Sequence, residues 1–481
     1  MPIGSSSASP ISRRDFLSQA SAVAAFSMAF WTGGCEGCIE EIEHRPTRHN
    51  IAGLSPTDPI VTTYRNAVAA MKALPSSNPI SWVAQANIHF NKCPHGCWFF
   101  LPWHRVYLLY FERICRKVTG DTNFALPYWN WTTSPAIPAP FWGGTSNALF
   151  DGTRGIGPTD NADPSWVGAS VIDGILSTPS FTLFGSDKPP GGLPTHQGNG
   201  YGQLESIPHN NIHGWIGGDM GAFHSPLDPI FWMHHNMLDC LWVDWNVNLG
   251  NANTNDTSWT DFKINDFVDE NGNPVSVPVI ETVLFPILSY QFEPCSPNES
   301  HNRPLRGSQL RKFLRTGAPS VLTFGTPHRT EAVSVAAGKP VKLSISMGPS
   351  DMQTVLGSDK RNRLVLTLEG VEMPAPSEVF VRVFLNKDDA SGDTAIDDPH
   401  YAGSFGVFSD PSAMGDMAKG QASKFLVDLT SAVQKLNRAG NMPLDRMNVT
   451  LVTMPYQHHR TQEQHDQVVK IQSVLLATAR L

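Results

Sequence analysis

Histidine is concentrated in two regions of this sequence. The first region includes KCPHGCWFFLPWHRVY (residues 92–107) and supplies three imidazoles, those of His89, His95 and His104. The second includes LESIPHNNIHGWIGG (204–218) and DPIFWMHHNMLDCLW (228–242), and it supplies His209, His213 and the adjacent pair His234 and His235. Imidazole is a good ligand for copper in both oxidation states. Two sets of three imidazoles, each drawn from more than one segment, therefore predict a pair of copper ions.

Other metal sites fit this pattern less well. In HNNIH, Asn210 stands where a zinc protease places the glutamate that acts as general base. A carboxylate-bridged di-iron site would need Glu-x-x-His on paired helices, and neither histidine region contains it. A single HxxxH pair is more often structural than functional. Six histidines in aromatic segments are harder to explain as structural residues alone.

Helices are predicted around the histidines. His209 and His213 are four residues apart, which places both rings on one face of a helix. Asp58-Pro59 is a typical helix start before residues 60–74, and Asp228-Pro229 is another before residues 230–245. A further helix is predicted from Trp103 to about Val118, ending at Gly120.

Long irregular connections and a β domain complete the organisation. Residues 132–201 are rich in Gly, Pro, Ser and Asp and are predicted to be loop. Beyond about residue 320, PVKLSISM, NRLVLTLEGV, EVFVRVFL and MNVTLVTM alternate apolar and polar residues, which predicts strands of a sandwich-like domain. SKFLVDLTSAVQKLNRAG (423–440) is predicted to be one helix within it.

Composition excludes some classes of partner. The 481 residues contain 35 Lys+Arg and 43 Asp+Glu, which gives a net charge of −8 and no basic surface for nucleic acid. No apolar run after the N-terminal segment is long enough to span a membrane.

The N-terminal 34 residues have the pattern of a targeting segment. Ser12-Arg13-Arg14-Asp15-Phe16-Leu17 is similar to a twin-arginine export signal, and the apolar residues 20–31 follow it. We expect export to the periplasm or the medium. A lipid anchor at Cys35 is a less favoured alternative, because Thr32 stands where such anchors usually have leucine.

The two histidine regions together resemble the type 3 copper family, which comprises tyrosinases, catechol oxidases (polyphenol oxidases) and, more distantly, mollusc hemocyanins. CPHGCWFFLPWHRVYLLYFER and LESIPHNNIHGWIGGDM…DPIFWMHHNMLDCLW carry the likeness, which covers roughly residues 60–245. HYAGSFGVF and KFLVDLTSAVQKL are similar to the β domain that follows the catalytic domain in plant enzymes.

The resemblance implies a mainly α catalytic domain over residues 35–304, built on a four-helix-bundle dicopper core with long loops. A linker (305–320) and a C-terminal β-sandwich-like domain (321–481) would follow. One copper ion would be held by His89, His95 and His104. The other would be held by His209, His213 and His235, while His234 is either a substrate contact or a packed helix residue.

The resemblance also suggests a thioether bond between Cys93 and His95, as in fungal relatives. Such a bond would leave six of the seven cysteines for disulfides. A disulfide from Cys93 to Cys97 or Cys38, or plain packing, is the alternative.

The activity implied is oxidation of a small phenol by O2. O-diphenols would become o-quinones, and monophenols would be hydroxylated at the ortho position after losing a proton. Glu205 and Asn210 match family positions that hold and activate a water for this proton transfer; a helix-entry carboxylate and a capping amide are the alternatives. Phe223 is a candidate gate over the first copper. Asp239 is a candidate acceptor of a hydrogen bond across the helix or partner of Arg105, and an ordinary surface carboxylate is the alternative.

Three rival functions remain open. The same centre, closed to phenols, would carry O2 as a hemocyanin does. An o-aminophenol oxidase would have identical ligands. A latent form, in which the C-terminal domain covers the copper pocket as a lid, is the third.

Overall fold

The computed structural model describes residues 45–196, 200–298, 322–357, 359, 361–374, 378–408, 423–440, 446–456 and 467–481. The predicted export signal, the alternative anchor at Cys35 and the predicted linker over residues 305–320 lie outside these residues. No helix within the described part is long and apolar enough to cross a membrane.

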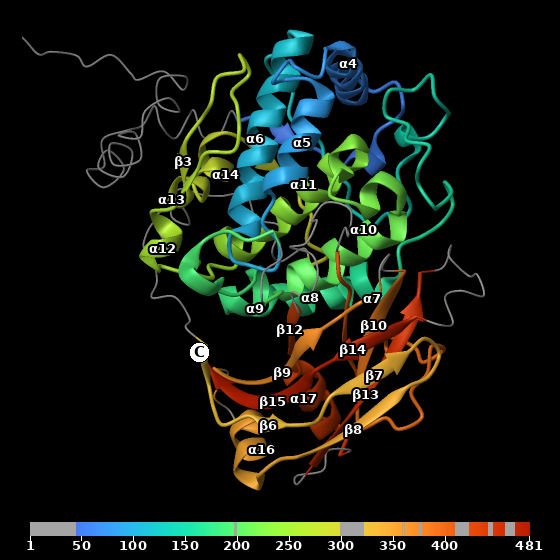
Figure 1. The fold of residues 1–481 in the computed structure, drawn as a ribbon, viewed down its shortest axis with the longest axis vertical. Helices are drawn as coiled ribbons and strands as arrows, with labels where there is room; N and C mark the ends of the chain where they lie inside the picture. Colours follow the sequence, from blue (N-terminus) through green and yellow to red (C-terminus); the bar gives the residue numbers. More distant parts are fainter. Residues whose placement is uncertain are drawn as a thin grey trace, which may run out of the picture.

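Helices form the N-terminal half of the molecule (Figure 1). They are α4 (Pro59–Ala73), α5 (Trp82–Lys92), α6 (Phe100–Thr119), α7 (Pro164–Val167), α8 (Ala169–Leu176), α9 (Phe181–Gly185), α10 (Asn210–Ile216), α11 (Ile230–Val243), α12 (Thr257–Thr260), α13 (Val279–Thr282) and α14 (Phe285–Leu288). Two short strand pairs accompany them, β1 (Thr47–Arg48) with β4 (Gln291–Phe292) and β2 (Lys263–Ile264) with β3 (Val277–Pro278).

The predicted helix boundaries follow from recognisable caps. The Asp58 side chain accepts a hydrogen bond from the Ile60 N–H at the start of α4. Gly120 ends α6 with a left-handed φ of 74°. Helix α6 begins at Phe100, before the predicted Trp103, because Pro102 is tolerated in the first turn.

The segment predicted as loop over residues 132–201 contains the short helices α7, α8 and α9. The side chains of Asp163 and Ser180 cap α7 and α9, each accepting a backbone N–H of the first turn. These helices lie between the larger helices and the strands (Figure 1).

Two larger antiparallel sheets and a separate strand pair form the described part of the C-terminal domain. The strands are β5 (Thr323–Phe324), β6 (His328–Arg329), β7 (Val333–Ala336), β8 (Val341–Ser346), β9 (Asn362–Val371), β10 (Val379–Leu385), β11 (Tyr401–Phe405), β12 (Ser423–Asp428), β13 (Arg446–Pro455), β14 (Val468–Ile471) and β15 (Ser473–Arg480). One sheet has the order β11-β10-β13-β8 and the other β12-β9-β15-β5, with β6 also paired to β15 and β14 paired to β7. Apolar residues of both sheets share one core, as in a sandwich. The helical core with a C-terminal β domain confirms the predicted fold class.

The prediction of one helix over residues 423–440 was wrong in its first half. SKFLVD is strand β12, paired with β9, and the helix α17 (Thr430–Arg438) begins only afterwards. The helix α16 (Pro349–Leu356) was not predicted. An apolar run of this length fits either structure, and the pairing with β9 decides it.

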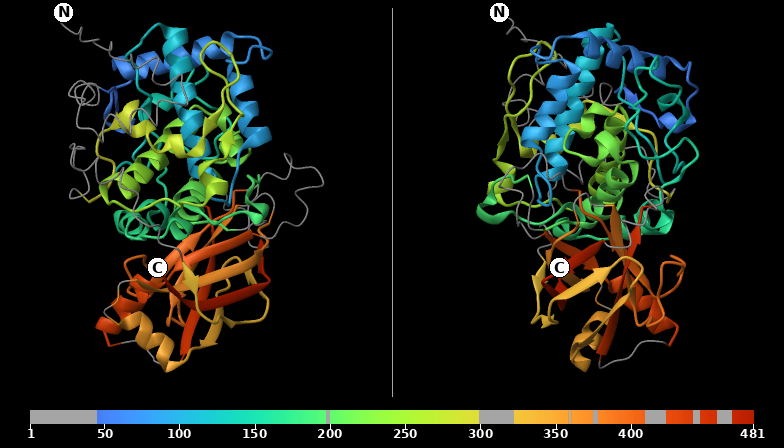
Figure 2. Two further views of the ribbon diagram at one scale, coloured as in Figure 1. Left: turned by 90° about the vertical axis from the view of Figure 1, so that its left-hand side faces the viewer. Right: turned by 45° about the vertical axis from the view of Figure 1, so that its right-hand side comes forward.

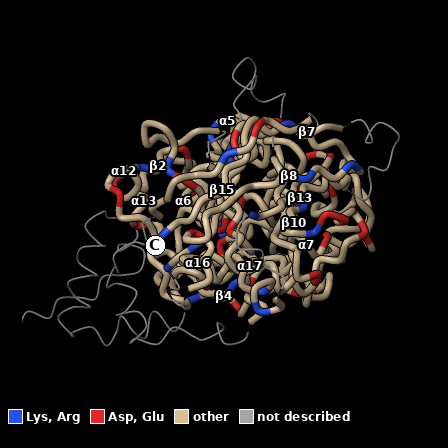
Figure 3. Tube along the Cα trace, turned by 90° about the horizontal axis from the view of Figure 1, so that it is seen from below, with Lys and Arg blue, Asp and Glu red and all other residues tan. Residues whose placement is uncertain are grey.

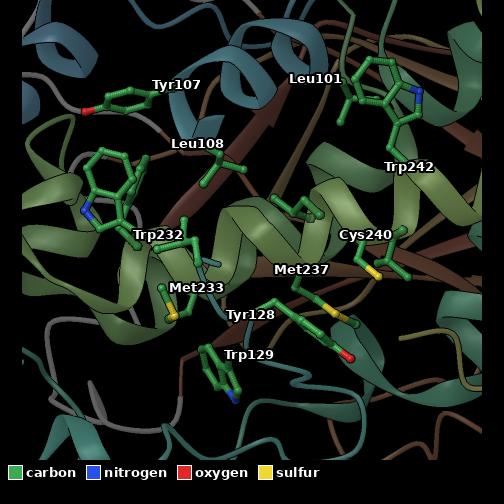
Figure 4. Packing of buried hydrophobic residues seen from close by; sticks show 14 of the residues in the cluster. Leu101, Tyr107, Leu108, Tyr128, Trp129, Trp232, Met233, Met237, Cys240 and Trp242 are labelled. Carbon is green, nitrogen blue, oxygen red and sulfur yellow. The ribbon is translucent and has the colours of Figure 1, made fainter. Parts of the chain in front are cut away.

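The helical core is built around α11 (Figure 4). Trp232, Met233, Met237 and Cys240 of this helix pack among Tyr107, Leu108, Tyr128 and Trp129, and all are buried. Three residues of the C-terminal domain, Phe380, Phe408 and Tyr456, belong to the same core.

The C-terminal domain abuts the helical domain below the bundle (Figure 2). Tyr201 forms a parallel bridge with Phe425, and Arg382 forms an ion pair with Asp163 at 2.8 Å. Acidic and basic residues are interspersed along the trace rather than gathered by sign (Figure 3).

Candidate metal centre

Four α-helices, one π-helical turn and one loop bring the predicted histidines together. His89 lies in α5, His104 in α6, His213 in α10 and His235 in α11. His209 ends η4 (Glu205–His209), a single π-helical turn that runs directly into α10. His95 lies in the loop between α5 and α6.

The rings form two triads that touch each other. In the first triad the ring centroids of His89, His95 and His104 are 5.5 to 5.7 Å apart. In the second, those of His209, His213 and His235 are 4.5 to 5.5 Å apart. Between the triads, His104 lies 4.3 Å from His235. All six rings therefore surround one small volume.

Hydrogen bonds orient four of the rings. The Nδ1 atoms of His89, His104 and His213 lie 2.7 to 2.8 Å from the carbonyl oxygens of Phe223, Phe100 and Met220. Nδ1 of His209 lies 2.8 Å from Oδ1 of Asn210. Because these partners only accept, Nδ1 carries the proton and Nε2 keeps its lone pair for a ligand.

The ligand atoms fit a metal. The Nε2 atoms of His89, His104 and His209 and both ring nitrogens of His95 are buried without a hydrogen-bond partner among the described residues. Burial is the main cause that lowers the pKa of all six imidazoles, to about 3 for His104 and His213. Buried, neutral, unpaired nitrogens are unfavourable unless a metal ion binds them. The clusters are therefore capable of holding metal.

His235 lies at the junction of the two clusters. Its Nε2 is 3.3 Å from Nε2 of His213, and one of its ring nitrogens also lies within 4.8 Å of ring nitrogens of His89 and His104. A ring nitrogen of His234 lies within 4.8 Å of ring nitrogens of His209 and His213, and the His234 ring stacks on that of His209 with the centroids 5.5 Å apart. Whether His234 contacts substrate stays a prediction.

Phe223 lies at the first triad, where the sequence predicted a gate. Its ring is parallel to that of His95 at 5.5 Å, with an interplanar angle of 3°. Its carbonyl oxygen is the partner of His89. The ring can restrict access to His95, and the gating role stays a prediction.

Asp239 pairs with Arg105, as the sequence suggested. Oδ1 accepts from Arg105 Nε at 2.5 Å, and Oδ2 accepts from Tyr290 Oη at 2.6 Å. Arg48 also reaches Oδ2 at 3.3 Å. This buried network holds α11, and with it His235, against α6.

The proposed proton-transfer residues are both completely buried. Glu205 Oε1 accepts from the Gly96 N–H and Oε2 from the Ser186 hydroxyl, each at 2.7 Å. Burial raises the pKa of Glu205 to about 8, against these two hydrogen bonds, which lower it. The Asn210 amide nitrogen donates to the Gly406 carbonyl at 2.8 Å.

Three of the five cysteines in the described residues are not in a disulfide. Cys240 and Cys295 form a disulfide, whereas Cys93, Cys97 and Cys115 are buried free thiols. The alternative disulfide between Cys93 and Cys97 is thus absent, and the alternative with Cys38 involves a residue outside the described ones. Cys97 and Cys115, two of the six cysteines that a thioether at Cys93 would leave for disulfides, are unpaired. The Sγ atom of Cys93 lies within 4.8 Å of a ring nitrogen of His95, and the thioether stays a prediction.

The C-terminal domain contributes a ring to the centre that was not predicted. Phe408, from the C-terminal domain, lies 4.3 Å from His213 and 5.2 Å from His95 between ring centroids, and only 2% of it is exposed. HYAGSFGVF offers no local signal for this contact, because it depends on how the two domains dock.

Comparison with known proteins agrees with this geometry. The family model described as the common central domain of tyrosinase matches residues 66–198 and 159–248, and a domain of unknown function (DUF7868) matches residues 319–474. A tyrosinase of Hahella sp. (strain CCB-MM4) is 29% identical over 84% of this chain and 95% of its own length. A latent chloroplastic polyphenol oxidase of Prunus armeniaca is 32% identical over 75% of this chain, which spans 66% of that protein.

Solved structures share the fold. A latent aurone synthase and latent apple tyrosinase each have a TM-score of 0.66 at 23% identity, covering 91% and 90% of this chain and 89% and 97% of theirs. A functional unit of octopus hemocyanin has a TM-score of 0.53 at 17% identity, over 90% of this chain and 99% of its own. From its central domain, its relatives and its paired histidine clusters, the chain belongs to the type 3 copper family, as a member of the tyrosinase and polyphenol oxidase group of copper-dependent phenol oxidoreductases.

Proposed function

We propose that this protein uses O2 to oxidise o-diphenols to o-quinones and also hydroxylates monophenols at the ortho position. The observation that carries the proposal is the set of six buried, neutral imidazoles around one volume. His89, His95 and His104 would hold one copper ion, and His209, His213 and His235 the other. When bound, the copper pair supplies the binding and reduction of O2.

The protein's own contribution to monophenol hydroxylation is proton transfer. A phenol has a pKa of about 10, so it must pass its proton to a base at neutral pH. Glu205 is suited to this role because its carboxylate is buried and held by two donors. Positive charge from bound metal would favour its ionised form.

Asn210 is proposed to assist Glu205 by positioning the water that takes part in the proton transfer. Its carbonyl oxygen orients His209, and its amide NH2 is the group that would position a water beside Glu205. In the described structure this NH2 donates to Gly406 instead. We infer that the amide becomes available when Gly406 moves away.

That contact supports a second proposal, that the enzyme is latent. Gly406 also donates its N–H to the Ser206 carbonyl at 2.9 Å, so this strand end is fixed both to η4 and to the start of α10. Phe408 then occupies the space in front of the histidines. A phenol ring and the Phe408 ring cannot both lie there. Two solved relatives of similar extent are themselves described as latent.

The rival functions predict different products. An oxygen carrier would bind O2 without forming quinone, and the shared hemocyanin fold does not decide between them. An o-aminophenol oxidase would convert aminophenols but not tyrosine.

The test of the proposed function is turnover of tyrosine, DOPA and an o-aminophenol by copper-loaded protein, before and after limited proteolysis near residue 310. We expect quinone from DOPA, hydroxylation of tyrosine and faster rates after cleavage. Absence of quinone after cleavage would reject the oxidase assignment, and unchanged rates would reject latency alone.

A further inference from the structure

Ser186 has a backbone conformation that serine rarely adopts. Its φ is 81° and its ψ is 160°, a region populated almost entirely by glycine. Asn386, with φ 51°, is the other non-glycine residue with positive φ in the described chain, and asparagine tolerates that value. A strained residue persists only when its surroundings hold it in place.

The Ser186 hydroxyl is buried and its hydrogen-bond direction is fixed. The oxygen lies 2.9 Å from the Gly202 backbone nitrogen and 2.7 Å from Glu205 Oε2. Because the Gly202 N–H can only donate, the hydroxyl accepts there. Its single proton therefore points to Glu205.

Glu205 connects the two histidine regions. It begins η4, the turn that ends at His209. Its other oxygen accepts from the N–H of Gly96, which directly follows His95. The rings of His95 and His209 lie 5.5 Å apart, one in each triad. Glu205 thus joins a segment of the first triad to a segment of the second.

The loop that carries His95 has further attachments to the chain around Ser186. The Gly200 N–H donates to the Gly96 carbonyl at 3.1 Å, and the Trp98 N–H donates to the Asp187 carbonyl at 2.9 Å. Unlike the other ligand rings of its triad, the His95 ring has no hydrogen bond of its own among the described residues. Its position therefore depends on the backbone of this loop.

We propose that Ser186 is a positioning residue. Its hydroxyl fixes the Glu205 carboxylate, which accepts the Gly96 N–H and so ties the loop of His95 to η4. This link, called the clamp below, fixes His95 relative to His209. The inference rests on the proposed copper site, whose two halves the clamp keeps at the spacing that a metal pair requires. Glycine would satisfy the backbone at this position more easily than serine. The hydroxyl adds only the link to Glu205 and Gly202.

Two substitutions separate the hydroxyl from the backbone. S186G removes the hydroxyl and relieves the strain of the positive φ. S186A also removes the hydroxyl but leaves that strain in place. N386G is the matched control: it relieves a positive φ and removes a side chain that accepts a backbone N–H, that of Asn448, in the C-terminal domain.

Copper content after dialysis against graded EDTA, together with thermal unfolding of the metal-free proteins, tests the clamp. We expect S186G and S186A to lose copper at about tenfold lower EDTA than the wild type and N386G, because supporting contacts of ligands affect metal affinity on this scale. S186A should also unfold at a lower temperature than S186G. Far-UV circular dichroism confirms that each variant is folded.

Copper retention at the wild-type level in S186G would overturn the clamp, and so would a loss confined to S186A, since strain alone would then explain it. A wild-type protein that retains no copper pair would reject the copper assignment itself, which is a different result from either of these.

Discussion

The ring of Phe408, in the C-terminal domain, lies 4.3 Å from the ring of His213, centroid to centroid. Removing this ring should open the site without proteolysis. We predict that F408A oxidises DOPA about tenfold faster or more. A change of about 1.4 kcal/mol in the free-energy difference between closed and open forms corresponds to a factor of ten, and the loss of a buried phenylalanine ring usually costs more than 1.4 kcal/mol. Initial rates at saturating DOPA measure it.

Phe384 provides a matched control. It is also buried, but in a separate cluster of the C-terminal domain with Ala390 and Val452. F384A should lower stability without raising the rate. Equal rates for F408A and the wild type would contradict latency through Phe408.

Glu205 and Asn210 should matter for monophenols more than for diphenols. In the cleaved protein or in F408A, we predict that E205Q and N210G lower tyrosine hydroxylation by about 100-fold, the usual contribution of a general base. DOPA oxidation should change by a few-fold only, since a catechol is more easily deprotonated. The ratio of the two rates is the measurement.

Copper content must be measured alongside, because Asn210 also orients His209. If the variants keep their copper and the tyrosine rate is untouched, the proton-transfer assignment is wrong.

The six clustered histidines could be found from sequence because each half of the cluster is concentrated in a short region of the chain. His209 and His213 share a helix face, and the caps at Asp58 and Gly120 fix neighbouring helices. Phe408 could not be found in this way, since its position depends on two domains docking.

Ser186 and Glu205 illustrate the same limit. Glu205 was singled out because it matches a family position four residues before His209. Its contacts with Gly96 and Ser186 come from segments without periodicity. The strand over residues 423–428 was missed for a related reason, because its pairing with β9 overrides a run that also suits a helix.

Asp239 should be critical for stability. In D239A the buried Arg105 would lose its only carboxylate partner in the described structure, and Tyr290 would lose its acceptor. We predict a loss of about 3–5 kcal/mol in the free energy of unfolding, the usual cost of an unpaired buried charge. Urea denaturation of metal-free protein measures it.

The exposed pair of Arg329 and Glu369 is the control. E369Q should cost roughly 0–1 kcal/mol, because solvent screens such pairs. A similar small loss in D239A would show that the buried network does not hold α11.

The predicted thioether has a mass signature. Joining Cys93 Sγ to a His95 ring carbon removes one hydrogen from each residue; this two-electron oxidation would use O2, the co-substrate of the proposed activity, as its oxidant. The peptide containing both residues should therefore be lighter by two hydrogens. Peptide mass spectrometry of copper-loaded protein checks this, with C93A and copper-free protein as controls. An unmodified, alkylatable Cys93 in copper-loaded protein would contradict it.

Quantitative metal analysis of the purified, copper-loaded chain, repeated for H104A and H213A, tests the central assignment most directly. The proposed site predicts two copper ions per wild-type chain and fewer in each variant. One copper or none in the wild type, or two in both variants, would contradict it.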